Sequence, residues 1–364
     1  MKTDRGIELT LPTNTNSIVF GGDTSLGDYY LDSPKWSHQR ARLLTHPASF
    51  FDGVRGLIGD DDFAVLNFES VLLKDRQTAS PLGKDYPGWD DPSRTIPVLK
   101  NLNVGAVNLA NNHTKDFGAT NLIESICLLN QDGISTFGAG GNSHQARLPL
   151  ILHKADSRLY VFAAMQYRKR YQEELNYYAT ATAPGINLLD DNVLKAITEV
   201  RKEDPAAVIV VCPHWGANYQ WSDEVTRQLS KELISAGADL VIGHGSHMLG
   251  ECITGNDGIR ILSLGNFVFN SPGRYEKHGA PPFSLVAKLP LSARINRSDI
   301  QVHLYPIVSD NRLTEFRPRT VTRLECEKVY ELLLSVSDDK SEFLRRFELR
   351  SDERGFFIKT SNSQ

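Results

Sequence analysis

Asp, Glu, Asn and His side chains recur directly after short apolar segments of this sequence. Those segments lead into GGDTSLG, NFES, NLANNHTKD, CPHWG, IGHGSH and SLGNFVF. In an α/β sheet the ligand crevice lies outside the carboxyl ends of the strands. We therefore expect these polar residues to converge on one site, although they lie far apart along the chain.

The residue types at these strand ends indicate a metal site. Mixed nitrogen and oxygen ligands suit a borderline divalent metal such as manganese, iron or zinc, whereas calcium and magnesium sites rarely use imidazole. A carboxylate that bridges two ions would allow them to activate water for an in-line displacement at phosphorus. The sequence predicts one or two divalent ions, with these candidate ligands: Asp23, Glu69, Asn112, His214, His244 and His247.

Each candidate ligand also has a purely structural explanation. Asp23 could be a turn or helix-cap residue, and residues 111–113 could cap a helix that begins nearby. His214 could be a core histidine that is satisfied by hydrogen bonds. Glu69 is harder to explain in this way, because Glu is seldom buried unless it is paired or bound to a metal. The joint pattern, rather than any single residue, supports the metal site.

The elements that would position these residues are those of an α/β fold. Short apolar segments alternate with helical patterns, and continuous apolar segments are typical of strands that are buried on both faces. We expect helices over residues 119–132, 224–236 and 321–335, and long loops over residues 74–97 and 270–282. The expected strands cover residues 17–21, 63–67, 104–109, 159–164, 207–212, 240–243, 259–264, 283–289 and 301–307.

Composition excludes several classes of protein. The 364 residues include 40 Lys and Arg against 44 Asp and Glu, so there is no basic footprint for nucleic acid. The four cysteines, scattered without a CxxC pair, favour a reducing cytoplasm. We expect no membrane anchor, because the sequence has neither an N-terminal apolar stretch nor 18 consecutive apolar residues. It also lacks the phosphate-binding and dinucleotide-binding glycine motifs.

With these motifs, the sequence resembles the CapA family, also called PgsA, of capsule and poly-γ-glutamate synthesis proteins within the calcineurin-like metallophosphoesterase superfamily. The resemblance runs from about residue 18 to residue 269. It implies an α/β four-layer sandwich, in which helices flank two central mixed β-sheets and the metal centre lies at one sheet edge. On this basis we expect an N-terminal tail (1–16), a CapA-like metallophosphoesterase domain (17–310) and a C-terminal helical extension that packs on the same domain (311–364). The most specific matching segments are NFES, NLANNHTKDFG, FGAG, HWG, AGADLVIGHGSH and SLGNFVF.

The resemblance implies a role for each ligand. Asp23 and His247 resemble ligands of the first metal, and Glu69 resembles the carboxylate that bridges the two metals. The ligands of the second metal would then be Asn112, His214 and His244.

The resemblance also implies catalytic residues and a wall for the site. His113 would face the substrate, where it protonates a leaving oxygen or stabilises charge, and Asp116 would orient it. Asn266 would form part of the site wall. Lys84 and Arg168 are candidates for contact with an anionic substrate, although the segment around Arg168 also fits a solvated helix.

Three features depart from the family pattern. Ser25 stands where the superfamily motif Asp-x-His has its histidine, so the first metal loses a ligand and the site could hold a single ion. Asn218 stands where many members have the Glu of HWGxE, which removes a negative charge. Members that act in polymer synthesis are typically membrane-anchored, whereas we expect no anchor here.

Two functions stay open from the sequence. The first is a metal-dependent hydrolase whose expected substrates are phosphoesters, in which metal-activated water attacks and His113 assists the leaving group. The second is a biosynthesis factor for poly-γ-glutamate, capsule or peptides that binds acidic chains or acyl-phosphates beside a ligase, without phosphoesterase turnover. The expected substrate is an anionic small molecule, a peptide or polyglutamate. The oligomeric state is not predicted.

Overall fold

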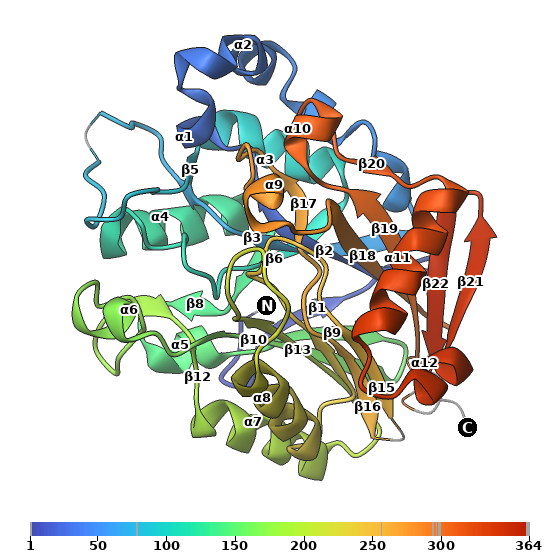
Figure 1. The fold of residues 1–364 in the computed structure, drawn as a ribbon. Helices are drawn as coiled ribbons and strands as arrows, with labels where there is room; N and C mark the ends of the chain where they lie inside the picture. The colour runs from blue at the N-terminus through green and yellow to red at the C-terminus, as the bar shows by residue number, and fades with distance from the viewer. Residues whose placement is uncertain are drawn as a thin grey trace.

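The computed structural model describes residues 2–361, apart from residues 78, 256, 293, 294, 296, 298 and 299. Its strands form two large mixed sheets that lie face to face, and helices cover their outer sides (Figure 1). The expected α/β architecture of two central mixed sheets flanked by helices is confirmed. Met1 of the expected tail and residues 362–364 of the expected extension lie outside the described residues.

The first sheet has ten strands, in the order β21-β22-β19-β18-β2-β3-β6-β7, with β17 paired to β2 and β20 paired to β19. Strands β2, β3, β6, β7 and β17 run parallel to one another, whereas β18, β19, β20, β21 and β22 pair antiparallel. The strands are β2 (Ser17–Ser25), β3 (Asp62–Phe68), β6 (Val104–Asn108), β7 (Ser135–Phe137), β17 (Asn266–Phe269), β18 (Phe283–Pro290), β19 (Gln301–Val308), β20 (Arg319–Thr320), β21 (Phe347–Asp352) and β22 (Gly355–Ser361).

The second sheet has eight strands, in the order β1-β9-β10-β13-β14-β16-β15, with β12 paired to β10. Its central strands β10, β13, β14 and β16 are parallel. The strands are β1 (Ile7–Thr10), β9 (Leu150–Lys154), β10 (Ser157–Gln166), β12 (Leu188–Leu189), β13 (Val208–His214), β14 (Leu240–Ile242), β15 (Cys252–Gly255) and β16 (Gly258–Ile261). Two short ribbons join β4 (Val71–Leu72) to β5 (Trp89–Asp90) and β8 (Ala139–Gly140) to β11 (Gly185–Ile186).

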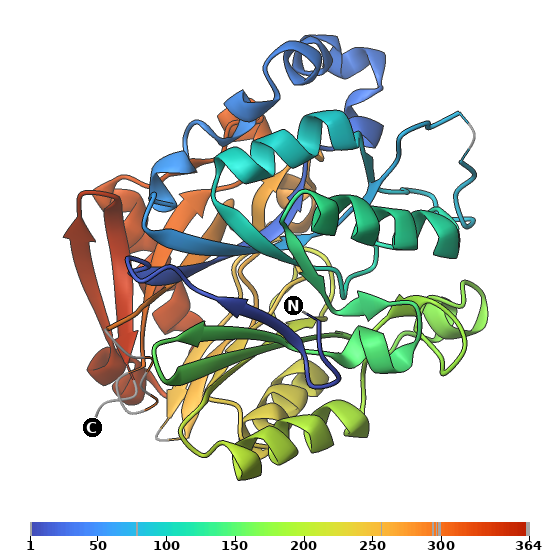
Figure 2. The same cartoon turned by 180° about the vertical axis from the view of Figure 1, so that it is seen from behind.

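Helices cover the outer face of each sheet, as the view from behind shows (Figure 2). Helices α3 (Pro92–Asn101) and α4 (Gly118–Gln131) pack on the ten-stranded sheet, and α7 (Asp191–Glu203) and α8 (Glu224–Ser235) pack on the eight-stranded sheet. Near the C-terminus, α11 (Arg323–Val336) contacts β22, and α12 (Lys340–Arg346) contacts β15. The short helices are α1 (Asp28–Leu31), α2 (Ser37–Thr45), α5 (Ser143–Arg147), α6 (Lys169–Glu173), α9 (Tyr275–His278) and α10 (Asn311–Thr314).

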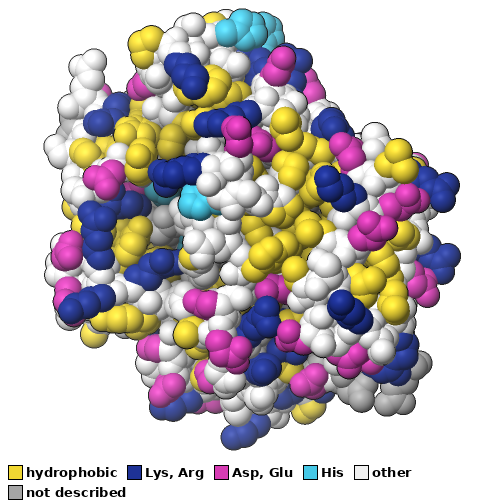
Figure 3. Space-filling model, viewed as in Figure 1, with side chains coloured by type: hydrophobic (Ala, Val, Ile, Leu, Met, Phe, Trp, Pro, Cys, Tyr) yellow, Lys and Arg dark blue, Asp and Glu magenta, His cyan; other side chains and the backbone are white. Residues whose placement is uncertain are grey.

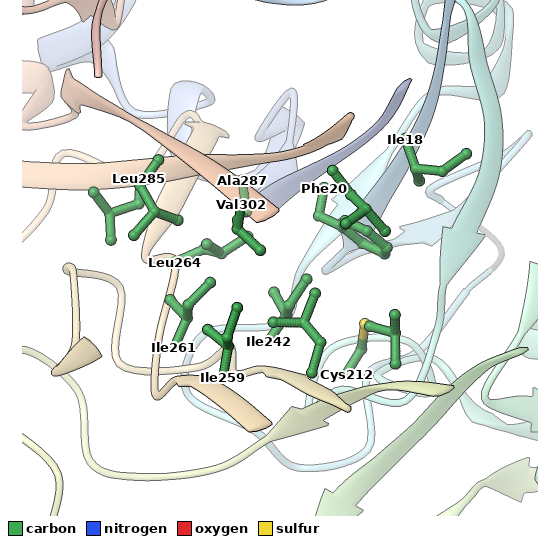
Figure 4. Packing of buried hydrophobic residues seen from close by; sticks show 14 of the residues in the cluster. Ile18, Phe20, Cys212, Ile242, Ile259, Ile261, Leu264, Leu285, Ala287 and Val302 are labelled. Carbon is green, nitrogen blue, oxygen red and sulfur yellow. The ribbon is translucent and has the colours of Figure 1, made fainter. Parts of the chain in front are cut away.

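The main core lies between the two sheets (Figure 4). Ile18 and Phe20 of β2 and Leu285 of β18 face Ile242 of β14 and Ile261 of β16, and all five are buried. Each fully buried side chain of this size contributes about 1.5–3 kcal/mol to stability. This packing fixes the two sheets relative to each other, and so fixes the strand ends from which the site is built.

All nine expected strands are confirmed within a few residues, and so are the three expected helices. Both expected loops contain secondary structure: residues 74–97 include β5 and the first part of α3, and residues 270–282 include the short helix α9. Pro92 occupies the first turn of α3, where a missing N–H costs nothing, and the Asp91 side chain caps the helix by accepting from the Ser93 N–H. Pro97 lies inside this helix, at the expense of one backbone hydrogen bond.

The two ends of the chain contribute strands as well as helices. Residues 7–10 of the expected tail form β1. The hairpin of β21 and β22 within the expected helical extension supplies two of the ten strands of the larger sheet. The division into a tail, a domain and an extension stays a prediction. Within the residues that the structure describes, no helix is long and apolar enough to cross a membrane.

Candidate metal centre

The site lies where the carboxyl ends of strands from both sheets meet. Asp23 is in β2 and Glu69 follows β3, both in the ten-stranded sheet. His214 ends β13 and His244 follows β14, both in the eight-stranded sheet. The four residues are almost fully buried. The convergence that parallel strands predict is present, and it joins the two sheets.

Asp23 contacts two histidines that follow β14. Its Oδ2 lies 3.1 Å from the Nδ1 of His247, and its Oδ1 lies 3.8 Å from the Nδ1 of His244. Asn266, the first residue of β17, places its Oδ1 2.9 Å from the same Nδ1 of His247. His247 has a φ of +60°, a backbone conformation that is unfavourable for residues other than glycine and is often retained at functional sites.

Several buried polar atoms at this point have no hydrogen-bond partner among the described residues. They include Oδ2 of Asp23, both carboxylate oxygens of Glu69, Oδ1 of Asn112 and Nδ1 of His244. Ligand atoms of Asp23, Glu69 and His247 all lie within 4.8 Å of one another. A buried polar atom without a partner is costly. This triad could therefore hold a metal ion, and the mixed oxygen and nitrogen donors fit a borderline divalent cation.

The protonation of two of the histidines also fits metal binding. Burial lowers the pKa of His244 to about 4 and the pKa of His214 well below its usual value. Both imidazoles are therefore neutral at neutral pH, the form in which histidine binds metals. Burial raises the pKa of Asp23, but its interactions with His247, followed by those with His214 and His244, outweigh burial and lower that pKa. Burial and the nearby charge of Asp23 raise the pKa of Glu69 well above its usual value.

Asn67, which sequence reasoning missed, supports two of the predicted ligands. Its Nδ2 donates a 2.8 Å hydrogen bond to Oδ1 of Asp23 and lies 3.5 Å from Nδ1 of His214. Its Oδ1 accepts a 3.1 Å hydrogen bond from Asn111. The spacing contained a signal, because Asn67 stands two residues before Glu69 and alternate residues of a strand share one face.

The glycine after His244 leaves room for His214. Gly245 has a φ of +105°, and a Cβ there would lie 2.9 Å from Nε2 of His214 and 2.7 Å from the backbone oxygen of Trp215. Only glycine avoids both the backbone strain and this contact. The sequence GHG around His244 therefore lets the two histidines lie on adjacent strand ends.

His113 and Asp116 form the expected pair. The Nδ1 of His113 lies 2.6 Å from Oδ2 of Asp116, and its Nε2 lies 3.8 Å from Oε1 of Glu69. The Gly88 N–H and the Tyr177 hydroxyl also donate to Asp116, at 2.7 Å each. Burial, followed by the charge of Lys84, lowers the pKa of His113. Asp116 thus contacts the Nδ1 side of the imidazole, and Nε2 lies toward Glu69.

Lys84, an expected contact for an anionic substrate, binds Asp116 of this pair. Its Nζ is 2.5 Å from Oδ1 of Asp116, and it also donates to the backbone oxygen of Asn112. Its ammonium group lies near the rings of Tyr171 and Tyr177. Lys84 therefore connects the loop before α3 to the loop after β6.

Ser25 is engaged away from the centre. Its hydroxyl donates a 2.7 Å hydrogen bond to Oδ1 of Asp90, a carboxylate that also accepts from the N–H groups of Leu26 and Gly27. Burial, followed by the charge of Asp28, raises the pKa of Asp90 to about 6. The residue that replaces the superfamily histidine thus belongs to a separate buried network.

A cleft of about 470 Å³ opens over His113 and His247. On this face of the molecule, histidine lies at a hollow with Lys and Arg side chains around it (Figure 3). Asn112, an expected metal ligand, lines the cleft, whereas Arg168 does not and donates instead to the backbone oxygen of Gly216. Other lining residues are Tyr30, Lys84, Asp85, Tyr86, Arg170, Tyr171, Asn218, Tyr219, Arg274 and Arg312.

Comparison with known proteins identifies the family. Residues 17–271 match the sequence profile of the family described as bacterial capsule synthesis protein PGA_cap. This range covers well over half of the sequence, and the chain belongs to this family, as the resemblance of the motifs implied.

Relatives carry names from the same field. The chain is 28% identical over 225 residues to the capsule biosynthesis protein CapA of Bacillus anthracis, which covers 60% of this chain and 53% of that protein. It is 26% identical over 262 residues to the PGA biosynthesis protein CapA of Bacillus subtilis (strain 168), which covers 70% and 63%. The chain thus spans between about half and two thirds of these relatives. A crystal structure of a hypothetical protein from Thermus thermophilus aligns over 84% of this chain and 96% of that one, at 15% identity and a TM-score of 0.39.

Proposed function

We propose that this chain is a metal-dependent hydrolase that acts on phosphoesters. One observation carries the proposal: the buried side chains of Asp23, Glu69 and His247 lie together at one junction of strand ends, and oxygens of both carboxylates have no hydrogen-bond partner among the described residues. Perturbed, buried titratable groups below a cleft are typical of catalytic sites. The basic surroundings of the cleft favour an anionic substrate.

The residues divide the work as follows. Asp23, Glu69 and His247 would hold one ion, and Glu69 would share a second ion with the three remaining expected ligands, Asn112, His214 and His244. When bound, a divalent ion lowers the pKa of water and polarises a phosphoryl group. Because Ser25 is engaged with Asp90, the first position has one protein ligand fewer than the superfamily pattern implies.

His113 would handle the proton of the leaving group. Asp116 accepts the Nδ1–H of His113 and so fixes the ring with Nε2 toward Glu69. A proton on Nε2 would be passed to the leaving oxygen, and the carboxylate of Asp116 stabilises the imidazole while it carries that proton. Lys84 and Tyr177 hold Asp116 in place.

A second candidate function is favoured by the names of the relatives. Capsule and PGA biosynthesis proteins match more than half of this chain. In that role, the site would bind acidic chains or acyl-phosphates beside a biosynthetic ligase, without phosphoester turnover. For either role we propose a cytoplasmic location, which the four free cysteines support.

Hydrolysis of p-nitrophenyl phosphate in the presence of Mn²⁺ separates the two candidates. A hydrolase should turn this substrate over, and His113→Ala should lower kcat by about 10²–10⁴-fold without loss of bound metal. His38→Ala, which removes an exposed histidine of α2, is the matched control and should keep full activity. Binding of acidic polymer by the wild type without any turnover would instead favour the second candidate.

A further inference from the structure

The basic residues of the cleft differ in how fully they are already paired. Lys84 binds Asp116, Arg170 lies 3.4 Å from Glu174, and Arg312 lies 3.2 Å from Glu276. Arg274 lines the same cleft and has no acidic partner within the described part of the chain. Its guanidinium lies over the ring of Tyr86, at 5.1 Å from the centroid.

Arg274 is held at a defined place relative to the metal centre. The next residue, Tyr275, is buried, and its hydroxyl donates a 2.6 Å hydrogen bond to the backbone oxygen of His247. The same hydroxyl lies 3.3 Å from Nδ2 of Asn266. Tyr219 packs between this anchor and the site, because its ring lies 4.9 Å from Tyr275 and 5.6 Å from His247. The backbone of Arg274 is therefore tied to a candidate metal ligand.

The charge balance around Arg274 favours an anion. Of the described residues that line the cleft, four are Lys or Arg and one, Asp85, is acidic. Asn218, which also lines the cleft, contributes no charge. Arginine presents a planar set of donors that matches a carboxylate or a phosphate with two parallel hydrogen bonds. The stack on Tyr86 restricts the guanidinium and reduces the entropy that binding costs.

We propose that Arg274 binds a second anionic group of the substrate, a carboxylate or a phosphate, while the reacting group lies at the metal centre. The substrate then carries at least two anionic groups, which are separated by a spacer. This inference rests on the proposed function for the position of the first group. It adds a specificity residue at the cleft wall that is distinct from the residues expected to bind metal or transfer protons.

Phosphonates test this proposal without turnover, because their C–P bond resists phosphoester hydrolysis. The probes are hexylphosphonate, 6-phosphonohexanoate and hexane-1,6-bisphosphonate, and their affinities for the full chain are measured by calorimetry with Mn²⁺ present. The first probe has one anionic group, the second adds a carboxylate and the third adds a phosphonate. The flexible chain lets the second group reach a range of positions in the cleft.

We expect at least one of the two probes with two anionic groups to bind the wild type about tenfold more tightly than hexylphosphonate. In Arg274→Gln this advantage should fall to within about twofold, while the affinity for hexylphosphonate is unchanged. Arg350→Gln, which removes an exposed arginine of β21, is the control for net charge and should behave as wild type. The second anionic group of the substrate is a carboxylate if 6-phosphonohexanoate gains more affinity, and a phosphate if hexane-1,6-bisphosphonate does.

Two results would overturn the proposal. One is equal affinity of the wild type for all three probes, and the other is an advantage of the dianions that persists in Arg274→Gln. Failure of the hydrolase proposal is read separately, from p-nitrophenyl phosphate turnover. A protein without turnover that still shows the Arg274-dependent advantage would retain the anion site and lose the proposed reaction.

Discussion

Glu69 combines deep burial with two carboxylate oxygens that no donor of the described chain satisfies. Nearby Asp116, equally buried, accepts from His113, Tyr177, Lys84 and the Gly88 backbone. A buried carboxylate with a purely structural role is expected to accept several hydrogen bonds, as Asp116 does, because an unpaired buried charge is costly. The contrast between the two residues is the main reason to assign Glu69 to a metal and Asp116 to the support of His113.

Removal of the Lys84 ammonium should destabilise the protein. Lys84→Met takes a charged donor from buried Asp116 and should lower the free energy of unfolding by about 2 kcal/mol. Lys100→Met is a matched control, because Lys100 pairs with Asp132 at 3.2 Å on the surface, where such pairs contribute less than about 1 kcal/mol. Chemical denaturation measures both. Equal losses in the two variants would contradict the structural role of Lys84.

Asp90 should make stability depend on pH. Its pKa of about 6 lies above the value of about 3.9 for an unfolded Asp, so the folded protein binds this proton more tightly. The stabilisation from this group is complete below about pH 4 and is lost as the pH rises through 6. Asp90→Asn cannot ionise, so its stability deficit relative to the wild type should shrink by about 2–3 kcal/mol between pH 4 and pH 7.

The measurement for Asp90 is urea denaturation of both proteins at the two pH values. The Asn side chain loses an acceptor for the backbone N–H groups of Leu26 and Gly27, and that cost does not vary with pH. Only the change in the deficit therefore reports the carboxyl group. A deficit that is the same at pH 4 and pH 7 would show that the carboxyl group is not held in the protonated form by burial.

Individual site residues were predictable where a polar side chain follows a strand that is buried on both faces. Asp23, Glu69 and His214 have that setting, and all three lie at the junction of strand ends. Asp90, in the two-residue strand β5, and Tyr177, in the loop after α6, had no such signal, because their positions depend on tertiary contacts. The partner of Ser25 could not be read from sequence for the same reason.

At the scale of elements, the loop after β14 leaves little space for a side chain at Gly245. Gly245→Ala would introduce both a strained backbone and a Cβ at 2.9 Å from Nε2 of His214. We expect a loss of at least about 1 kcal/mol of stability together with weaker metal binding. The strain alone is tested by Gly216→Ala, because Gly216 has a φ of +76° and no atom within 4 Å of the added Cβ.

Manganese titration and denaturation of both glycine variants provide the comparison. Gly216→Ala should lose stability and keep the metal affinity of the wild type, whereas Gly245→Ala should lose both. If Gly245→Ala kept the metal affinity of the wild type, His214 would not need the space that the glycine leaves.

The elements that the sequence predicted well are those with the strongest local pattern. Strands β2, β3, β6, β13 and β14 are continuous apolar segments, and α4 and α8 have one apolar stripe each. Strands β1 and β9 were missed: β1 lies at the sheet edge and pairs only with β9 among the described strands, and β9 lies between β1 and β10. The start of α3 was missed because proline, which disrupts the interior of a helix, here occupies its first turn.

At the scale of the whole molecule, two sheets have to meet before the site exists. His244 and His247 approach Asp23 only because the inter-sheet core brings β14 against β2. The sequence predicted convergence at strand ends, and the resemblance to the CapA family supplied the two-sheet arrangement. The cleft wall could not be predicted, since Arg274 owes its position to a tyrosine anchored on His247.

The central claim is that Glu69 and its neighbours hold a divalent metal, and elemental analysis tests it most directly. Purified wild type and the control Glu331→Gln, which changes an exposed residue of α11, should each contain or take up about one or two equivalents of manganese, iron or zinc. Glu69→Gln should lose most of this metal while it remains folded. Absence of bound or restorable metal in the wild type, or an unchanged metal content in Glu69→Gln, would contradict the account.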